Sequence, residues 1–426
     1  MQKVIIHIMN KNWFHTDTFK LELKLLEEIY ISDNIHNFLF YKWDKIDDYE
    51  FEKSLNNNGI YIYNYVNRGD IIEKVRNINT KNNVLYIHTT IETTMNITNE
   101  LKTLIWQTSP ENHKIFRDKF IQRELVSKHN PDLGIKYISG TFDKLDFSDI
   151  SSKTGVPFIL KPTTGVQSTW VVKINSRLEF ENYTKHFTNY NTILSGKGID
   201  GHTLIAEEFI DGNLYSIDYF VSKTWKIVVS EPIKEKLWID IWIDDYFVLS
   251  RITTKEVQNT FRYIRLDKFI KDTVVAMKIK NSFIHHEFKI NSHWQLKTIE
   301  VNGRIGWWRH ELMYKAFGIN FFRFILDEKQ RFCEIQENVI WINVLSTKNG
   351  ILEWFNTKLF QEIEELASVY EVIIQKNHIW KKCWLTKDGF SRVWTIKLSN
   401  IDEIQLNKDY SFIEKNYKNL LKISEN

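Results

Sequence analysis

The 426-residue sequence predicts a protein of the α/β class with more than one domain. Strand-like and helix-like segments alternate over the first 110 residues, and the stretch that follows Val156 is rich in strands. A third region after about residue 330 mixes both kinds of segment. Because a chain of this length rarely forms a single core, we expect two or three domains.

The N-terminal region, residues 1–110, is predicted to be an open, Rossmann-like α/β domain. Its first strand is Lys3–Ile8, and Asp17–Tyr30 has the apolar period of a helix. Further strands are expected at Ile35–Tyr41 and Val84–His88. No G-x-G-x-x-G follows the first strand, which disfavours a nicotinamide cofactor.

The middle of the chain begins with a predicted helix, Lys114–His129. Strands are then expected at Phe158–Lys161, Thr169–Ile174, Leu204–Ile210, Tyr215–Val221, Lys226–Ser230, Phe283–Ile290 and Gln295–Val301. The last two flank a short turn, Asn291–Trp294, and so predict a hairpin. The third region, residues 329–426, is predicted to be a small α+β region with strands at Val339–Val344 and Val372–Gln375, a helix at Lys358–Ala367 and a helical tail from Lys408.

Composition excludes several classes of protein. Apolar residues are 43% and charged residues 26%, which is ordinary for a folded chain. The 57 basic residues are spread among 54 acidic ones, so neither nucleic acid nor a membrane is an expected partner. No apolar run approaches the length of a membrane span. Cys333 and Cys383 form no disulfide framework or zinc motif and suit a reducing compartment, so we expect a cytoplasmic protein.

The predicted hairpin carries the strongest chemical signal. Its centre falls between His293 and Trp294, which places Glu287 directly opposite Glu300 and puts Asn302 on the same face. Two facing carboxylates repel unless a cation lies between them. Two carboxylates and an amide oxygen suit Mg²⁺ held together with nucleotide phosphates. A solvated strand face with chance acids is the alternative.

Three other segments offer groups that bind phosphate. Arg304 follows Asn302 at the spacing of the hairpin face, and a guanidinium can clamp a phosphoryl group. Lys161 ends a strand and precedes a loop that contains Gly165 and Ser168. The S-G-K-G run at 195–198 lacks the remaining residues of a P-loop and is expected to be a flexible loop. Leu204–Asp218, with its paired acids, reads by itself as a plain hairpin.

Taken together, these segments resemble the ATP-grasp superfamily over roughly residues 112–326. T-I-E-V-N-G-R-I-G at 298–306 is similar to the metal-binding E-x-N-x-R signature of that family, and H-H-E-F at 285–288 is similar to the strand with the partner acid. R-D-K-F-I-Q-R at 117–123 resembles the D-K-x-x-x-R helix. The H-x-E form is similar to the bacterial L-amino acid ligases. The resemblance implies an ATP-grasp domain over 111–328, with a small lobe over about 111–205 and a main lobe over about 206–328.

The resemblance also implies roles for residues in the small lobe. Lys119 and Lys161 would contact the ATP phosphates, and Gly165 to Ser168 would belong to a lid loop over them. Residues 195–201 would form a second mobile loop. The adenine would be held by a hinge made of Glu207, Glu208, Phe209 and Ile210.

In the main lobe, the resemblance implies that Glu287, Glu300 and Asn302 bind Mg²⁺, with Mn²⁺ as a substitute. Arg304 would steady the transferred phosphoryl group. His285 would contact the carboxylate substrate or the phosphate, whereas His286 points to the opposite face and is expected in the core.

Two positions depart from the family pattern. Leu214 stands where many members carry an acid that binds the ribose, so either nucleotide binding is weaker or Asp218 or another group substitutes for that acid. Trp307 and Trp308 follow R-I-G where many relatives have a second Gly. Their rings would narrow the site or stack on a substrate, or they would pack against the C-terminal region, which is the expected role of one of the two.

The implied activity is ATP-dependent carboxylate–amine ligation through an acyl phosphate, on amino-acid-like acids and amines. Two alternatives remain: a carboxylase or phosphoryl-transfer enzyme that uses bicarbonate or another acid, and a degenerate module that binds nucleotide without turnover. Small molecules are therefore the expected partners, and a homodimer is expected by analogy only.

Overall fold

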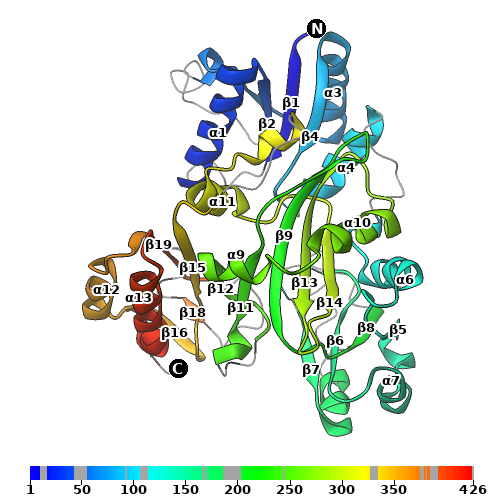
Figure 1. Ribbon diagram of the computed structural model, residues 1–426, viewed down its shortest axis with the longest axis vertical. Helices are drawn as coiled ribbons and strands as arrows, with labels where there is room; N and C mark the ends of the chain where they lie inside the picture. The colour runs from blue at the N-terminus through cyan, green and yellow to red at the C-terminus, as the bar shows by residue number, and fades with distance from the viewer. Residues whose placement is uncertain are drawn as a thin grey trace.

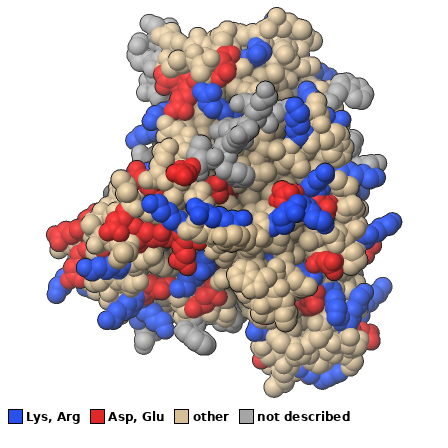
Figure 2. Space-filling view, in the orientation of Figure 1, with Lys and Arg blue, Asp and Glu red and all other residues tan. Residues whose placement is uncertain are grey.

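The computed structural model describes most of the chain and arranges it around four β-sheets (Figure 1). The described residues are 1–9, 17–42, 55–91, 94–105, 114–165, 168, 170–185, 203–241, 243, 245–326, 334–374, 379, 381–383 and 392–424. Within them, no helix combines the length and the apolar character that crossing a membrane requires. On the face shown in Figure 2, acidic and basic side chains are interspersed, and no extended basic tract is present there.

The N-terminal domain is the open α/β unit that the sequence predicted. Its strands are all parallel, in the order β3-β2-β1-β4, and comprise β1 (Lys3–Met9), β2 (His36–Tyr41), β3 (Ile60–Asn64) and β4 (Asn83–His88). The helices of this domain are α1 (Asp17–Asp33), α3 (Arg68–Lys81) and α4 (Met95–Leu104). Because β2 and β4 flank β1 on opposite sides, the winding of the sheet reverses between β1 and β4.

The small lobe is an antiparallel sheet in the order β5-β8-β6-β7. Its elements are α6 (Lys119–His129), β5 (Tyr137–Thr141), α7 (Phe147–Thr154), β6 (Phe158–Pro162), β7 (Val172–Ile174) and β8 (Thr203–Glu208). One face packs Phe158, Leu160 and Ala206 into an apolar core. Strand alternation therefore turns Lys161 and Glu207 to the other face.

The main sheet runs in the order β14-β13-β9-β11-β12-β15-β19-β17, with β10 paired to β9. Its strands are β9 (Asn213–Val221), β10 (Ile227–Val229), β11 (Ile233–Leu237), β12 (Val248–Thr253), β13 (Ser282–Ile290), β14 (Leu296–Asn302), β15 (Asn338–Val344), β17 (Val369–Ile374) and β19 (Trp394–Asn400). The pairing of β12 with β15 carries this sheet across the expected boundary near residue 328. The C-terminal region thus extends the sheet of the main lobe.

The remaining elements cover this sheet and close the C-terminal region. The helices are α9 (Lys255–Thr260), α10 (Leu266–Ala276), α11 (Arg309–Phe317), α12 (Thr357–Glu364) and α13 (Glu403–Asn416). A small sheet joins β16 (Gly350–Phe355), β18 (Lys382–Cys383) and β20 (Leu421–Ser424). The tail departs from the prediction, because its helix begins at Glu403 and is followed by β20. Leu312 and Phe317 of α11 share a core with Leu25 and Leu26 of the N-terminal domain.

Strand β14 lies at the edge of the main sheet, and α6 satisfies its backbone through side chains. The buried amide of Gln122 donates to Val301 O (2.9 Å) and accepts from Val301 N–H (3.0 Å), as a neighbouring strand would. Arg123 donates to Ile299 O (2.6 Å). Helix α6 itself begins at Lys119 because the Asp118 carboxylate accepts the Phe120 N–H (2.9 Å). The small lobe is therefore fixed against β14 at the level of Glu300.

Replacing Gln122 by Leu should destabilise the protein, because both backbone groups of Val301 would lose their partners in a buried position. We expect a loss of about 2–4 kcal/mol in the free energy of unfolding, measured by urea denaturation. The matched control is Gln361→Leu at an exposed position of α12, where we expect a change within about 0.5 kcal/mol. Equal effects of the two substitutions would contradict this role of Gln122.

Candidate active site

The hairpin of β13 and β14 has the register that the sequence predicted. Glu287 lies opposite Glu300, and His285 lies opposite Asn302. A β-bulge follows Glu287 in the pairing, so the register shifts only on the turn side of these residues. Two carboxylates, an amide and an imidazole therefore share one face of the main sheet.

Lys119 of α6 faces this group from the small lobe. Its Nζ lies 3.1 Å from the Glu300 carboxylate and 3.5 Å from Gly165 O. Burial would raise the pKa of Glu300, but the positive charges of Lys119 and Lys161 outweigh burial and hold that pKa below its usual value. Lys119 thus connects the predicted metal ligands with the start of the predicted lid.

A second buried ionic group lies on the same face of the small lobe. Lys161 Nζ is 2.7 Å from Glu207, and an Arg123 nitrogen is 2.9 Å from the same carboxylate. Burial lowers the pKa of Lys161, and two cations hold the pKa of Glu207 below its usual value although burial alone would raise it. The Glu207 carboxylate is therefore paired with both Lys161 and Arg123.

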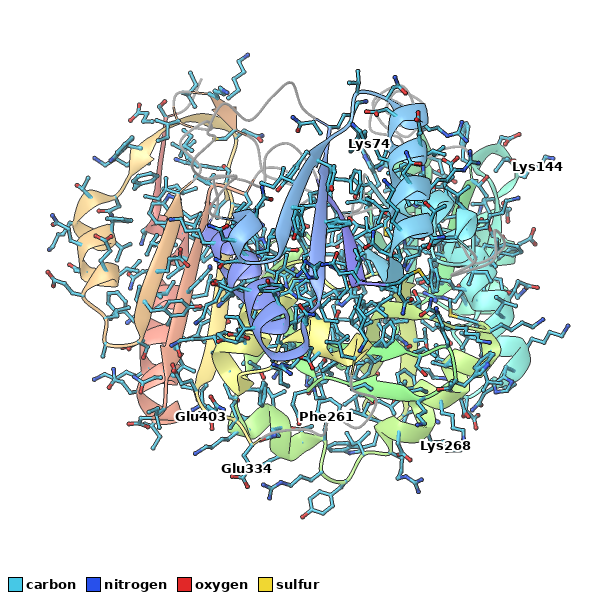
Figure 3. All side chains as sticks on the ribbon, turned by 90° about the horizontal axis from the view of Figure 1, so that it is seen from above. Lys74, Lys144, Phe261, Lys268, Glu334 and Glu403 are labelled. Carbon is cyan, nitrogen blue, oxygen red and sulfur yellow. The ribbon has the colours of Figure 1, made fainter. Side chains whose placement is uncertain are left out.

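The other predicted hinge residues border a hollow of about 740 Å³. Glu208 accepts the Lys136 N–H (2.8 Å), and Ile210 O accepts from Lys289 Nζ (2.8 Å). Lys173 Nζ lies 3.9 Å from the centre of the Phe209 ring. A hollow of about 790 Å³ near Lys268, at the rim of the molecule in Figure 3, contains none of the predicted site residues. The first hollow thus adjoins the predicted adenine-binding residues Glu208, Phe209 and Ile210.

Asp218 of β9, which the sequence offered only as a possible substitute for the ribose-binding acid, lies beside His285 in the structure. It pairs in register with His285, and both of its oxygens lie 3.3 Å from His285 Nδ1. It also accepts the Gly306 N–H (2.6 Å). Asp218 therefore orients His285 and fixes the turn that follows Arg304. The signal in the sequence is the alternation in Y-S-I-D, but the pairing of β9 with β13 was needed to interpret it.

His285 is held between two acids. Its Nε2 lies 3.4 Å from Glu287, on the opposite side of the ring from Asp218. Burial would lower the pKa of His285, yet the Asp218 charge and the hydrogen bonds raise it above its usual value. His286 is fully buried and stacks on Phe269 (4.8 Å), which confirms that it belongs to the core.

A buried arginine supports this face of the sheet from α11. Arg309 contacts Glu235 and Ser216, and its Nε lies 3.6 Å from Asp218. Arg251 lies beside Glu235 in the adjacent strand, and burial lowers its pKa to about 10. Acids and guanidinium groups therefore alternate beneath the site, so each buried charge has an opposite charge near it.

The remaining predicted residues lie around this centre. Arg304 is half-buried and donates to Ile305 O (3.1 Å). Ser168 has a left-handed backbone (φ 55°), whereas Val166, Gln167 and residues 195–201 lie outside the described residues. Leu214 is buried in an apolar cluster with Leu237 and Val248.

Trp308 packs toward the C-terminal region, as expected for one of the two tryptophans. Its ring lies 5.7 Å from that of Trp341, and the Arg392 guanidinium lies 4.2 Å above it. Trp307 is half-buried beside it, with ring centres 5.2 Å apart. The structure thus places both rings directly after the turn that Asp218 fixes.

The chain is similar to known ATP-grasp proteins in sequence over part of its length and in overall fold. A model of the ATP-grasp domain family matches residues 154–311, and no curated protein sequence matches the chain. An L-amino acid ligase from Bacillus licheniformis is similar in structure, with a TM-score of 0.69 at 16% identity over 100% of this chain and 99% of that one.

Two further solved structures share the architecture. N5-carboxyaminoimidazole ribonucleotide synthetase from Thermotoga maritima has a TM-score of 0.60 at 12% identity, over 100% of both chains. The biotin carboxylase domain of Hydrogenobacter thermophilus 2-oxoglutarate carboxylase, a dimer in complex with MgADP and bicarbonate, has a TM-score of 0.60 at 13% identity, over 99% of this chain and 90% of that one. The matched domain and the shared architecture show that this chain carries an ATP-grasp domain and has the ATP-grasp fold.

Proposed function

We propose that the protein is an ATP-dependent carboxylate–amine ligase that forms an amide through an acyl phosphate. The observation that carries the proposal is the facing pair Glu287 and Glu300, with Lys119 of the other lobe 3.1 Å from Glu300. Acids on one lobe and lysines on the other are what a site needs if it is to bind a metal and phosphates together.

The oxygen atoms of Glu287, Glu300 and Asn302 fit Mg²⁺, and Mn²⁺ is an acceptable substitute. The fit rests on the facing register of the two carboxylates, whose mutual repulsion a divalent cation would offset. When bound, the ion would neutralise phosphate charge during transfer. The similar biotin carboxylase domain was solved with MgADP, which supports the same nucleotide here.

The chain's own residues would act on the phosphates and on the acid. Lys119, Lys161 and Arg304 would stabilise negative charge as an oxygen of the substrate carboxylate displaces ADP from the γ-phosphorus. His285, oriented by Asp218, would hold the carboxylate. An amine nitrogen would then attack the acyl carbon, phosphate would leave, and the nitrogen would lose a proton to give the amide.

Amino acids are the substrates that we propose, because the similar structures include an L-amino acid ligase. The similar biotin carboxylase domain was solved with bicarbonate, and it favours carboxylation as the second candidate. In both reactions a carboxylate or bicarbonate takes the γ-phosphoryl group first. The second substrate therefore distinguishes them.

The function should be tested by release of ADP and phosphate with Mg²⁺ and a panel of L-amino acids, singly and in pairs. We expect release that needs two amino acids, together with a new amide mass in mass spectrometry. Release that needs bicarbonate would favour carboxylation. Binding of MgATP without release under any of these conditions would indicate a module without turnover.

The control for that assay is Glu300→Gln, which keeps the shape of the side chain and removes its charge. We expect release to fall to the background level in this variant, since the negative charge that would face the metal and that pairs with Lys119 is lost. Release that persists in Glu300→Gln would come from a contaminating phosphatase.

Arg304→Ala should lower turnover more than nucleotide binding, because its guanidinium is proposed to act on the transferred phosphoryl group. We expect kcat to fall by roughly 10²–10³-fold while the Kd for MgATP changes little. The matched control is Arg265→Ala, whose side chain is 78% exposed and pairs with Asp267. An unchanged kcat in Arg304→Ala would refute the role proposed for this residue.

A further inference from the structure

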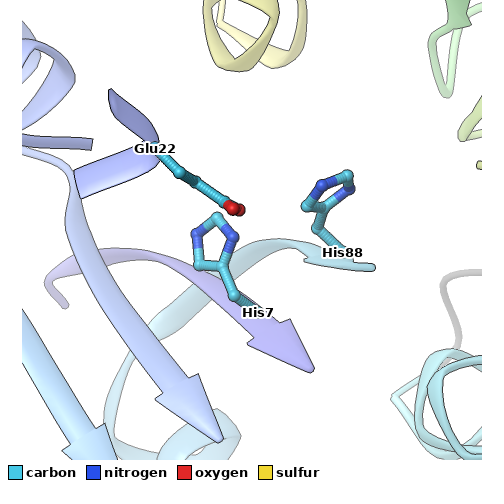
Figure 4. A group of neighbouring side chains, drawn as sticks. All are labelled: His7, Glu22 and His88. Carbon is cyan, nitrogen blue, oxygen red and sulfur yellow. The ribbon is translucent and has the colours of Figure 1, made fainter. Parts of the chain in front are cut away.

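A compact group of side chains able to bind a metal lies in the N-terminal domain, where the His88 ring borders Phe283 at the start of β13 (5.7 Å between ring centres). His7, Glu22 and His88 each direct one ligand atom to a common point, and these atoms lie within 4.8 Å of one another (Figure 4). All three residues are buried, with exposed fractions of 1%, 3% and 2%. Among the residues that the structure describes, this is the group of three His, Cys, Asp or Glu side chains with such convergence.

The position of the group follows from the topology. His7 of β1 and His88 at the end of β4 are partners in register on adjacent parallel strands. The order of the sheet reverses between β1 and β4, and ligands of open α/β sheets bind at the carboxyl ends of the strands at such a point. Glu22 comes from α1, so three separate elements supply the group.

The hydrogen bonds of Asn37 prepare His7 to accept a ligand. The Asn37 amide nitrogen donates to Leu26 O (3.3 Å) and Ile35 O (3.2 Å), so its oxygen faces His7. His7 Nε2 therefore carries the proton and donates to that oxygen (3.2 Å). The lone pair of the ring is left on Nδ1, which is buried and has no hydrogen-bond partner among the described residues.

His88 offers a second buried ring nitrogen that could bind a metal. Its Nε2 is buried and also has no hydrogen-bond partner within the described part of the chain. Both rings are almost fully buried, with exposed fractions of 1% and 2%, and burial favours the neutral form that binds a metal. Buried polar atoms of this kind normally have a partner, and a cation beside Glu22 would supply one for both rings.

We propose that His7 Nδ1, His88 Nε2 and the Glu22 carboxylate bind one Zn²⁺ ion per chain. Two imidazoles and a carboxylate form a donor set that zinc accepts in tetrahedral sites, with a water or a further side chain as the fourth ligand. Asn37 supplies the outer hydrogen bond that typically fixes a metal-binding histidine. The oxygen ligands of the hairpin favour Mg²⁺, so the two sites select different metals.

The bound ion would tie α1 to the ends of β1 and β4. His310 of α11 packs beside the group, with its ring centre 5.8 Å from that of His88, and its neighbour Arg309 contacts Glu235. The proposed site thus lies where the N-terminal domain meets the helix beneath the active site.

The test is metal analysis of the intact protein without an affinity tag, after removal of bound metal with a chelator. The protein is reconstituted with Zn²⁺ in excess Mg²⁺, which occupies the oxygen site, and is then desalted. We expect one zinc per chain, a rise in the Tm on zinc addition, and with Co²⁺ in place of zinc the visible absorption of a four-coordinate ion. Absence of retained zinc and of the cobalt spectrum in the wild-type protein would overturn the proposal.

Variants locate the ion. His7→Asn with His88→Asn should abolish zinc retention, and Glu22→Gln, which keeps the size of the side chain, should lower it strongly. His36→Asn is the matched control, because His36 is a buried histidine on the adjacent strand β2. Equal zinc in all variants would place the ion elsewhere and refute the site. Circular dichroism and stabilisation by MgATP report whether each variant is folded, and Glu22→Gln decides the case if the double variant is not.

Discussion

The joint between α6 and β14 is the constraint on which the candidate active site depends. An edge strand in a buried position needs partners for its backbone, and here the Gln122 and Arg123 side chains supply them across more than 170 residues of sequence. The same helix begins with Lys119, so satisfying the strand also sets the distance from Lys119 to Glu300. The contacts that satisfy the backbone of β14 therefore also bring the Lys119 charge to Glu300. This is why the small lobe meets the hairpin beside Glu300.

The charged side chains of the candidate active site form ion pairs, and these pairs follow one another from the surface into the interior. Lys119 meets Glu300, His285 lies between Glu287 and Asp218, and Arg309 meets Glu235 behind them. Each partner offsets the cost of burying the other, so the removal of a single member exposes its neighbour to that cost. Asp218 differs from the other members because it also accepts a hydrogen bond from the Gly306 N–H. It therefore links the His285 imidazole to the turn after Arg304.

The sequence alone predicted what depends on local pattern and missed what depends on the order of strands. The register of Glu287 and Glu300 follows from a short turn and the two-residue period of strands, and the structure has it. The open α/β domain and the core position of His286 were likewise predictable from alternation. Asp218 was not, because β9 pairs with β13 although more than sixty residues separate them. Nor could alternation show that Glu207 forms ion pairs with both Arg123 and Lys161, since Arg123 comes from helix α6 and not from the strands of the small sheet.

The continuation of the main sheet into the C-terminal region has a consequence for synthesis on the ribosome. The N-terminal sheet is complete once residue 88 has emerged, whereas β12 has one unpaired edge until β15 follows some ninety residues later. An open edge of this kind readily pairs with other chains, and such non-local contacts form slowly. For the 35 residues between the end of β14 at Asn302 and the start of β15 at Asn338, the strands that bear the candidate site have been made while the sheet beside them is unfinished. The open edge of β12 is therefore a place where the unfinished chain is prone to pair with other chains, and β15 covers it in the finished structure.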